Sequence, residues 1–224
     1  MSDQDAVIRV TNGQFASNTY LVRTGTPGEC VLIDPGLDLD AIEQALETTS
    51  LVPAAIFVTH GHFDHVGSAE HLRRKYSIDL HMSQADAKIA RSSNFLMMAF
   101  KVAARIDVPN EFVPIEDGFT WSKGAVRVEA IPVPGHTPGS TILNVNGRLF
   151  SGDTIYRDDV WLTALPEQDR PLLIESVRGI WDLLPEAAEV YPGHGGSATF
   201  GQIKQSNIPL REMLGLVGTA SASD

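Results

Sequence analysis

Short apolar runs alternate with segments of helical spacing through the first third of the chain. The apolar β-type runs cover residues 6–10, 19–23, 30–33 and 54–58. Residues 39–47 and 66–76 have the periodicity of amphipathic helices, and Asp38 or Asp40 can cap the first of them. This order predicts an α/β fold in which 54–58 is a buried strand, followed by a loop and then a helix.

The rest of the chain returns to the strand pattern after one unusual stretch. The patterns predict strands at 112–115, 126–131, 141–145, 148–151 and 189–191, and helices at 171–184 and 200–216. Residues 84–108 have helical spacing and are rich in methionine and phenylalanine. They form either a helix that packs on the core or a cap whose apolar side chains line a pocket. We expect Pro209 to interrupt the last helix and the tail 218–224 to fray.

Length, composition and charge limit the classes of protein. With 224 residues and 43% hydrophobic content, the chain can bury one substantial core. We therefore expect a single domain over 1–224, with a helical insertion or cap at about 84–110. The formal net charge of −11 argues against nucleic acid or an anionic membrane as a partner, since both select clustered Lys and Arg. We expect a small-molecule substrate as the partner, and a homodimer remains open.

The start of the chain and its cysteine content indicate the compartment. No run approaches the roughly 18 apolar residues of a membrane span, and residues 1–5 are acidic, which argues against a cleaved signal peptide. Cys30 is the only cysteine and lies in an apolar run, so we expect a buried thiol and no intrachain disulfide. Together these features predict a cytoplasmic protein.

The segment from Thr59 to His65 combines three of the seven histidines with a carboxylate, directly after the run 54–58. Imidazole nitrogen and carboxylate oxygen are ligands of Zn²⁺ and of metals such as iron, and a His-x-His loop can aim two rings at one ion. A polar loop whose histidines only form hydrogen bonds is the alternative. However, so many titratable groups beside a buried strand are costly without a cation, so the segment predicts a metal site.

Three later turns each supply one further potential ligand. Each turn contains glycine and follows a β-type run, and the ligands are His136, Asp153 and His194. With the first segment they give five histidines and two aspartates, enough for two ions with three or four protein ligands each. His71 and His81 lie outside these turns, so we expect them to be ordinary surface or packing residues.

Five motifs in this order resemble the metallo-β-lactamase superfamily, and most closely its glyoxalase II-like (hydroxyacylglutathione hydrolase-like) hydrolases. They are Leu32-Ile33-Asp34-Pro35-Gly36, the His-x-His-x-Asp-His core at 60–65, His136-Thr137-Pro138-Gly139, Ser151-Gly152-Asp153-Thr154 and Tyr191-Pro192-Gly193-His194-Gly195. The resemblance covers nearly the whole chain. It implies an αββα sandwich of two mixed β-sheets flanked by helices, with the metals at one edge.

The resemblance also implies a set of metal ligands. By this resemblance, one ion would be held by His60, His62 and His136, and the other by Asp64, His65 and His194. Asp153 would bridge the two ions. Asp34 has no obvious ligand role, so we expect it to orient the site from behind. The cofactors are two divalent ions. Zinc is the expected metal, with iron or manganese as alternatives, because His and Asp ligands accept all three.

A site of this kind favours hydrolysis. A hydroxide that bridges two metals stays deprotonated near neutral pH and can attack a thioester or ester carbonyl. Asp64 can also steer this nucleophile or relay its proton. Tyr156 either donates a proton to the leaving group or the oxyanion, or only packs beside the site. We therefore predict a dinuclear metal-dependent hydrolase.

Departures from the family narrow the choice of substrate. Asp153 stands where β-lactam-hydrolysing members carry cysteine or serine, so β-lactam hydrolysis is not expected. Few basic residues follow His194, and residues 156–161 replace a glycine-rich segment, which argues against glutathione specificity. Two alternatives stay open, a lactonase of the same fold and a mononuclear iron persulfide dioxygenase. The substrate must be read from Met97, Tyr156, Trp161 and their neighbours.

Overall fold

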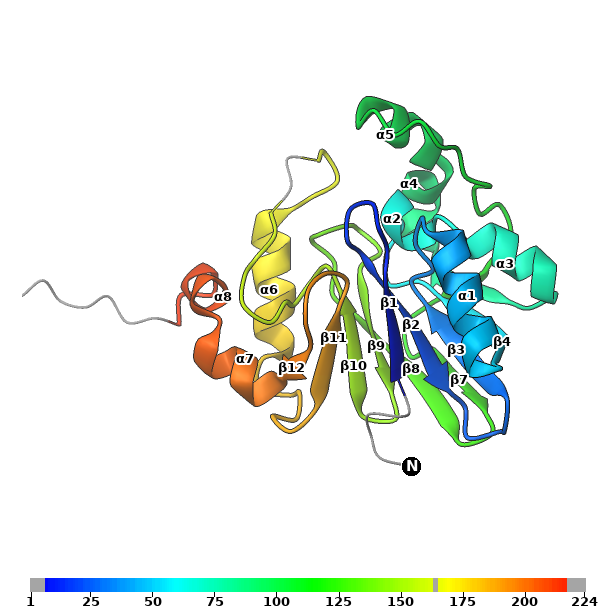
Figure 1. Cartoon of the computed structure of the whole chain (residues 1–224). Helices are drawn as coiled ribbons and strands as arrows, with labels where there is room; N and C mark the ends of the chain where they lie inside the picture. The colour runs from blue at the N-terminus through cyan, green and yellow to red at the C-terminus, as the bar shows by residue number, and fades with distance from the viewer. Residues whose placement is uncertain (1–6, 163–164, 217–224) are drawn as a thin grey trace, which may run out of the picture.

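Two six-stranded β-sheets lie at the centre of the molecule, and helices cover their outer faces (Figure 1). The structure is a computed structural model that describes residues 7–162 and 165–216. The tail 218–224, which is expected to fray, lies outside the described residues. Among the helices that the structure describes, none is both long and apolar enough to span a bilayer.

The first sheet has the strand order β1-β2-β3-β4-β5-β6. Its strands are β1 (Val7–Thr11), β2 (Asn18–Arg23), β3 (Glu29–Ile33), β4 (Val52–Phe57), β5 (Leu80–Ser83) and β6 (Val113–Ile115). The β1-β2 and β2-β3 pairs are antiparallel, whereas the pairs from β3 to β6 are parallel. Parallel neighbours need crossover connections, and α1 (Leu39–Thr49) and α3 (Ala69–Tyr76) provide two of them.

The second sheet has the order β12-β11-β10-β9-β8-β7. Its strands are β7 (Thr120–Lys123), β8 (Val126–Pro132), β9 (Thr141–Val145), β10 (Arg148–Gly152), β11 (Glu189–Pro192) and β12 (Ala198–Thr199). Only the β10-β11 pair is parallel among these described strands, and α6 (Arg170–Ile180) connects them. The helices α6, α7 (Phe200–Ser206) and α8 (Ile208–Met213) lie on the opposite side of the molecule from α1 and α3 (Figure 1).

The alternation of side chains along the inner strands creates separate apolar layers. Val31 and Ile33 of β3 pack with Val128 of the second sheet, between the two sheets. Cys30 and Leu32 point the other way and pack with residues of α1 and α3. Successive side chains of a strand point to opposite faces, so a strand covered on both faces is apolar throughout. A third layer lies between the second sheet and α6 to α8, which confirms the predicted αββα sandwich.

Residues 84–108, which have helical spacing, do not form one long helix. The structure has a 3-10 turn followed by two short helices, Gln84–Asp86, α4 (Ala87–Arg91) and α5 (Ser93–Ala99). Two serines at the junction favour a break, since their hydroxyls compete for backbone hydrogen bonds. In addition, the Asn94 side chain hydrogen-bonds the backbone N–H and C=O of Ile106, each at 3.0 Å. These long-range bonds favour a folded-back loop over a longer helix.

Several smaller elements also differ from the predictions. The strands β5, β7 and β12 have only two to four residues, too few for alternation to identify them. The helix predicted over 66–76 is α3, which begins only at Ala69, and a separate short helix, α2 (Phe63–Val66), precedes it. The helix predicted to continue to Leu184 ends at Ile180. The interruption expected near Pro209 is confirmed, because a break separates α7 from α8.

Candidate metal centre

Loops that follow β4, β8, β10 and β11 meet at one edge of the sandwich. The β3-β4 and β10-β11 pairs are parallel, and the carboxyl ends of parallel strands lie at the same edge of a sheet. The structure thereby brings together all seven side chains that the sequence marks as ligands. Each is buried, and they are His60, His62, Asp64, His65, His136, Asp153 and His194.

Three imidazoles, which we call the imidazole triad, form the first group of potential ligands. Nδ1 of His62 lies 3.1 Å from Nε2 of His60 and 3.1 Å from Nε2 of His136. Ligand nitrogens of a tetrahedral zinc site lie about 3.4 Å apart when the metal–nitrogen bonds are about 2.1 Å. The three rings therefore already converge at a spacing that fits one ion.

Asp64, His65 and His194, which we call the mixed triad, form a second group. Oδ2 of Asp64 lies 3.4 Å from Nε2 of His194 and 3.7 Å from Nε2 of His65. Asp153 lies between the triads. Its Oδ1 is 3.5 Å from Nε2 of His65, and its Oδ2 is 3.6 Å from Nε2 of His136. A carboxylate that faces both groups can bridge two ions.

Unpaired buried atoms favour a metal site over a simple hydrogen-bond network. Within the described residues, Nε2 of His65 and Oδ1 of Asp153 are buried without a hydrogen-bond partner. A buried polar atom left unpaired costs about 1–3 kcal/mol, and a cation between the triads would satisfy both atoms. Imidazole and carboxylate donors suit zinc, iron and manganese, so the residues present fit divalent ions.

Burial and charge act differently on the histidines of the centre. Burial holds the pKa of His60 well below its usual range and lowers the pKa of His136 to about 4. Burial also acts on His65 and His194, but the neighbouring carboxylates outweigh it and raise their pKa values to about 9 and about 10. These histidines in turn keep the pKa values of Asp64 and Asp153 low, despite the burial of the two carboxyl groups.

Asp34 lies directly behind the mixed triad. Its carboxylate accepts hydrogen bonds from the N–H and the hydroxyl of Thr59, each at 2.7 Å, and Oδ2 lies 3.0 Å from Nδ1 of His65. The backbone of Asp34 is in the left-handed region at φ 48°, which aspartate tolerates better than most residues. Because this carboxylate can accept the Nδ1–H of His65, it leaves Nε2 free to bind metal.

A second buried carboxylate, which the sequence does not indicate, joins two of the ligand-bearing loops. Asp86 accepts hydrogen bonds from the backbone N–H of Gly61 at 2.8 Å and of Gly139 at 2.7 Å. It also accepts one from the Thr137 hydroxyl at 2.7 Å. Burial raises the pKa of Asp86, although the three donors oppose the shift. This carboxylate therefore holds the His-x-His loop against the loop after β8.

Glu167 contacts the imidazole triad from outside. Its Oε1 lies 3.0 Å from Nε2 of His62, and this hydrogen bond lowers the pKa of Glu167. When His62 donates its Nε2–H to this carboxylate, its Nδ1 lone pair faces the other two imidazoles. The two residues are 105 positions apart in the chain, and no motif in the sequence connects them.

Gly193 provides the space that the bridging carboxylate occupies. A Cβ atom at this position would collide with Oδ1 of Asp153 and with Cε1 of His65. The N–H of Gly193 also donates to the carbonyl of Gly152 at 2.8 Å, which joins the turn of Asp153 to the turn of His194. Glycine is therefore required here by close approach.

An apolar pocket of about 210 Å³ opens onto the metal-facing atoms. Its lining residues, apart from the proposed ligands, are Phe15, Phe63, Phe100, Tyr156, Trp161 and Leu165. Phe63 packs edge-on to Phe15 with 5.1 Å between ring centroids, and Trp161 lies 4.8 Å from the ring of His194. The cap alternative predicts that methionine also lines this pocket. Met97 does not, because it is fully buried in a cluster with Phe63.

Tyr156 lies in this pocket as a potential proton donor. Its hydroxyl is buried without a hydrogen-bond partner in the part of the chain that the structure describes, and its ring stacks on Trp161 at 5.2 Å. Burial and the nearby carboxylate of Asp153 raise the pKa of Tyr156 well above its usual range. The side chain therefore keeps its proton at neutral pH and can donate a hydrogen bond.

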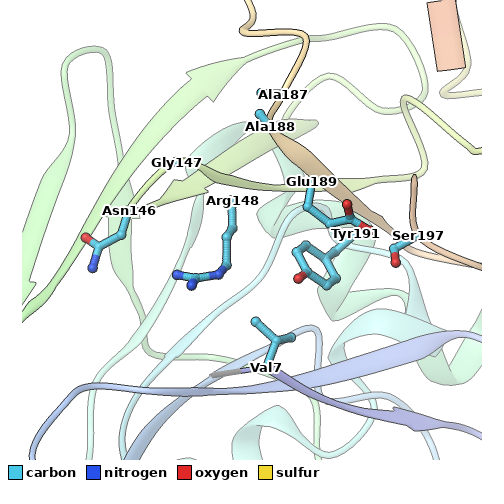
Figure 2. A pocket seen from close by; sticks show the side chains of 9 residues that line it. All are labelled: Val7, Asn146, Gly147, Arg148, Ala187, Ala188, Glu189, Tyr191 and Ser197. Carbon is cyan, nitrogen blue, oxygen red and sulfur yellow. The ribbon is translucent and has the colours of Figure 1, made fainter. Parts of the chain in front are cut away.

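A second cavity lies between β1 and the strands β10 and β11 (Figure 2). It has a volume of about 440 Å³, and Figure 2 shows Val7 on one side and Arg148, Glu189 and Tyr191 on the other. None of the seven proposed ligands lines it, and its described lining contains no histidine or cysteine. We therefore place the chemistry in the smaller pocket, where the titratable groups converge.

An αββα sandwich with a buried His/Asp cluster at one edge defines a class of metal-binding hydrolases. The chain belongs to the metallo-β-lactamase superfamily, because the model of the family described as "Metallo-beta-lactamase superfamily" matches residues 12–208. This match covers most of the chain and confirms the resemblance seen in the motifs.

Individual relatives agree with this assignment. The chain is 26% identical over 199 residues to a probable polyketide biosynthesis zinc-dependent hydrolase, BaeB, of Bacillus velezensis, covering 89% of this chain and 82% of BaeB. It is 30% identical over 185 residues to the hydroxyacylglutathione hydrolase GloC of Haemophilus influenzae, covering 79% and 84%. The crystal structure of TTHA1623 in a di-iron-bound form superposes with a TM-score of 0.81 and 31% identity, over 90% of this chain and 99% of TTHA1623.

Proposed function

We propose that this chain is a dinuclear metal-dependent hydrolase, similar to glyoxalase II, that cleaves a thioester or ester. The main support is the overlap of three potential ligand groups, each with its ligand atoms within 4.8 Å of one another. The groups are His60, His62 and His136; His60, His65 and Asp153; and Asp64, His65 and His194. Shared members between adjacent groups are expected where two neighbouring ions bind. The zinc-dependent and di-iron relatives support the same proposal.

Two divalent ions, when bound, supply a hydroxide near neutral pH and polarise the substrate carbonyl. The phenylalanines of the pocket bind the acyl group and exclude water from it. Asp64 steers the nucleophile or accepts its proton, since its carboxylate stays ionised beside His65 and His194. Tyr156 donates a hydrogen bond to the leaving atom or to the oxyanion. A thiolate needs little of this help, whereas an alkoxide needs more.

Metal analysis combined with a substrate panel tests this proposal. The panel contains a neutral thioester, S-lactoylglutathione, a simple ester, an acyl homoserine lactone and a chromogenic β-lactam. We expect about two ions per chain and hydrolysis of a thioester or ester. Asp153→Asn should reduce both metal content and turnover, whereas Asp158→Asn, at an exposed residue five positions later, should leave both unchanged. Full turnover with one ion per chain would contradict a dinuclear mechanism.

A lactonase is the second candidate, and the buried, protonated hydroxyl of Tyr156 is the observation that favours it. A lactone releases an alkoxide, which is a far stronger base than a thiolate, so proton donation matters more. Tyr156→Phe should therefore reduce lactone hydrolysis more than thioester hydrolysis if both occur. Iron in the purified protein, together with oxygen uptake on glutathione persulfide, would instead indicate the dioxygenase alternative.

A further inference from the structure

Residues 87–106, which we call the α4–α5 segment, differ in charge from the rest of the chain. The segment contains four basic residues and no acidic one, Lys88, Arg91, Lys101 and Arg105. The chain as a whole has a net charge of −11, so removing this +4 leaves −15 for all other residues. All four cations are exposed, and none forms an ion pair with a carboxylate of the described residues. The segment therefore carries a net positive charge, between Asp86 and Asp107, in an acidic chain.

The same segment exposes apolar side chains. Phe95, Met98 and Phe100 are 67%, 64% and 49% exposed, although large apolar side chains are normally buried. The opposite side of the segment is fixed, because Met97 and Val102 pack in a cluster with Phe63. Cations beside exposed aromatic rings form a surface that can hold anionic groups and stack planar ones.

This surface borders the entrance of the apolar pocket. Phe100 lines the pocket, and Lys101 follows it directly in the chain. Among the described residues that line the pocket there is no Lys or Arg, and the pocket has a volume of only about 210 Å³. It can therefore accept a small apolar acyl group, while any anionic part of a substrate has to lie outside, on the side of Phe100 and Lys101.

We propose that the substrate is an acyl thioester whose thiol part carries several phosphate groups. This inference rests on the proposed thioester hydrolase function. The acyl group occupies the apolar pocket, and the phosphates bind the four cations of the α4–α5 segment, with Phe95 available to stack a nucleobase. Four unpaired cations match several phosphate charges better than the small net charge of glutathione. In the reaction, water adds to the carbonyl and the C–S bond breaks, giving a carboxylate, the free thiol and a proton.

Two thioesters with the same acyl group test the proposal, butyryl-coenzyme A and butyryl-pantetheine. They share the reacting bond and differ only in the phosphorylated nucleotide. For the zinc-loaded wild type we expect kcat/KM to be at least about tenfold higher for butyryl-coenzyme A at low salt, mainly through KM. The preference should decline as ionic strength rises, because exposed charges are screened. Calorimetry with 3′-phospho-ADP provides a readout that does not depend on turnover.

Charge reversal in the segment locates the effect. Lys101→Glu/Arg105→Glu should lower kcat/KM for butyryl-coenzyme A about tenfold, weaken binding of 3′-phospho-ADP, and leave butyryl-pantetheine unchanged. The control, Lys123→Glu/Arg127→Glu, makes the same charge change at exposed positions of the β7-β8 hairpin. It should retain the wild-type preference, and zinc content should be equal in all three proteins.

The possible failures are distinguishable. Equal kcat/KM for the two thioesters overturns this inference and leaves the hydrolase function intact. No hydrolysis of either thioester by zinc-loaded protein overturns the proposed function, and this inference with it. If the same butyryl group is hydrolysed faster on a carrier protein, with no preference for coenzyme A over pantetheine, the surface binds a protein instead. Binding to phosphatidylserine vesicles without a coenzyme A preference also overturns the inference.

Discussion

The imidazole triad and the mixed triad share one pocket but differ in charge. The imidazole triad has no carboxylate of its own, and burial lowers the pKa of His136 to about 4. The mixed triad contains Asp64. Burial would lower the pKa values of its two histidines. The carboxylates of Asp64 and Asp153 outweigh burial and raise the pKa of His65 to about 9 and that of His194 to about 10. His60 and His136 thus offer neutral nitrogens, whereas the mixed triad combines charged groups of both signs.

This difference shows how one pocket can provide two kinds of metal site. Neutral imidazoles suit zinc, whereas a site with carboxylate oxygen also accepts harder ions such as manganese. The supporting carboxylates follow the same division. Asp34 contacts a ring of the mixed triad, and Asp86 contacts the loops of the imidazole triad. Substitutions that act on one triad at a time therefore test the comparison.

Removing one ring from each triad should have the largest effect. In His60→Ala and in His194→Ala we expect about one ion per chain in place of two. Turnover should fall more than about 100-fold, because the loss of a residue that only hydrogen-bonds a metal ligand already costs about 10–100-fold. Elemental analysis and kcat measure both effects. His71→Ala, at a half-exposed histidine, is the control, and two retained ions in either triad variant would show that the ring is not a ligand.

Asp34→Asn should affect the mixed triad selectively. An asparagine NH₂ facing Nδ1 of His65 would require the other imidazole tautomer, with the proton on Nε2, where the metal binds. We expect the weaker-held ion to dissociate about 10–100-fold more readily, as measured by competition with a chelator. Asparagine tolerates the positive φ of this position, so backbone strain is not expected to contribute. An unchanged metal affinity would mean that Asp34 does not orient the ring.

Asp86→Asn should instead loosen the two loops of the imidazole triad. The carboxylate accepts three hydrogen bonds with its two oxygens, so an amide nitrogen in place of either oxygen leaves at least one donor unpaired. We expect a loss of about 1–3 kcal/mol in the free energy of unfolding. Chemical denaturation measures this, with Asp117→Asn at an exposed turn as the control. Equal stability of the two variants would show that Asp86 does not hold the two loops together.

Glu167→Gln should have the smallest effect. The glutamine oxygen still accepts the Nε2–H of His62, so the ring keeps its orientation and only the charge is lost. We expect metal affinity and kcat/KM to fall by less than about tenfold. A loss above 100-fold would assign Glu167 a direct role in binding metal or substrate.

The ligand positions can be predicted from the sequence because each lies in a turn after an apolar run or, for Asp64 and His65, in the short helix that begins directly after such a turn. Such turns keep His60 or His194 at a strand end regardless of the packing elsewhere. The supporting residues are not readable in this way. Asp86 and Glu167 reach the site through tertiary packing, and the polar atoms that they contact are 25 or more positions away in the chain. Local patterns carry no information on such contacts.

The fold shows the same limit. The apolar run 54–58 predicts a buried strand, and the structure agrees, because Ile56 packs toward the helices and Phe57 packs between the two sheets. The α4–α5 segment has helical spacing throughout, yet α5 ends at Ala99 and the chain folds back so that the backbone of Ile106 bonds to the Asn94 side chain. Periodicity describes which side chains share a face, but not where a distant contact ends the helix.

A chain with a single cysteine has no disulfide within it, yet its metal centre joins segments that are far apart. His60 follows a strand of the first sheet and His194 follows a strand of the second, 134 positions later. Ions held between them would act as cross-links, which reduce the conformational freedom of the unfolded chain. In the entropic description, a covalent link across a loop of this length stabilises a protein by about 5 kcal/mol. The catalytic centre would thus also fasten the two sheets together.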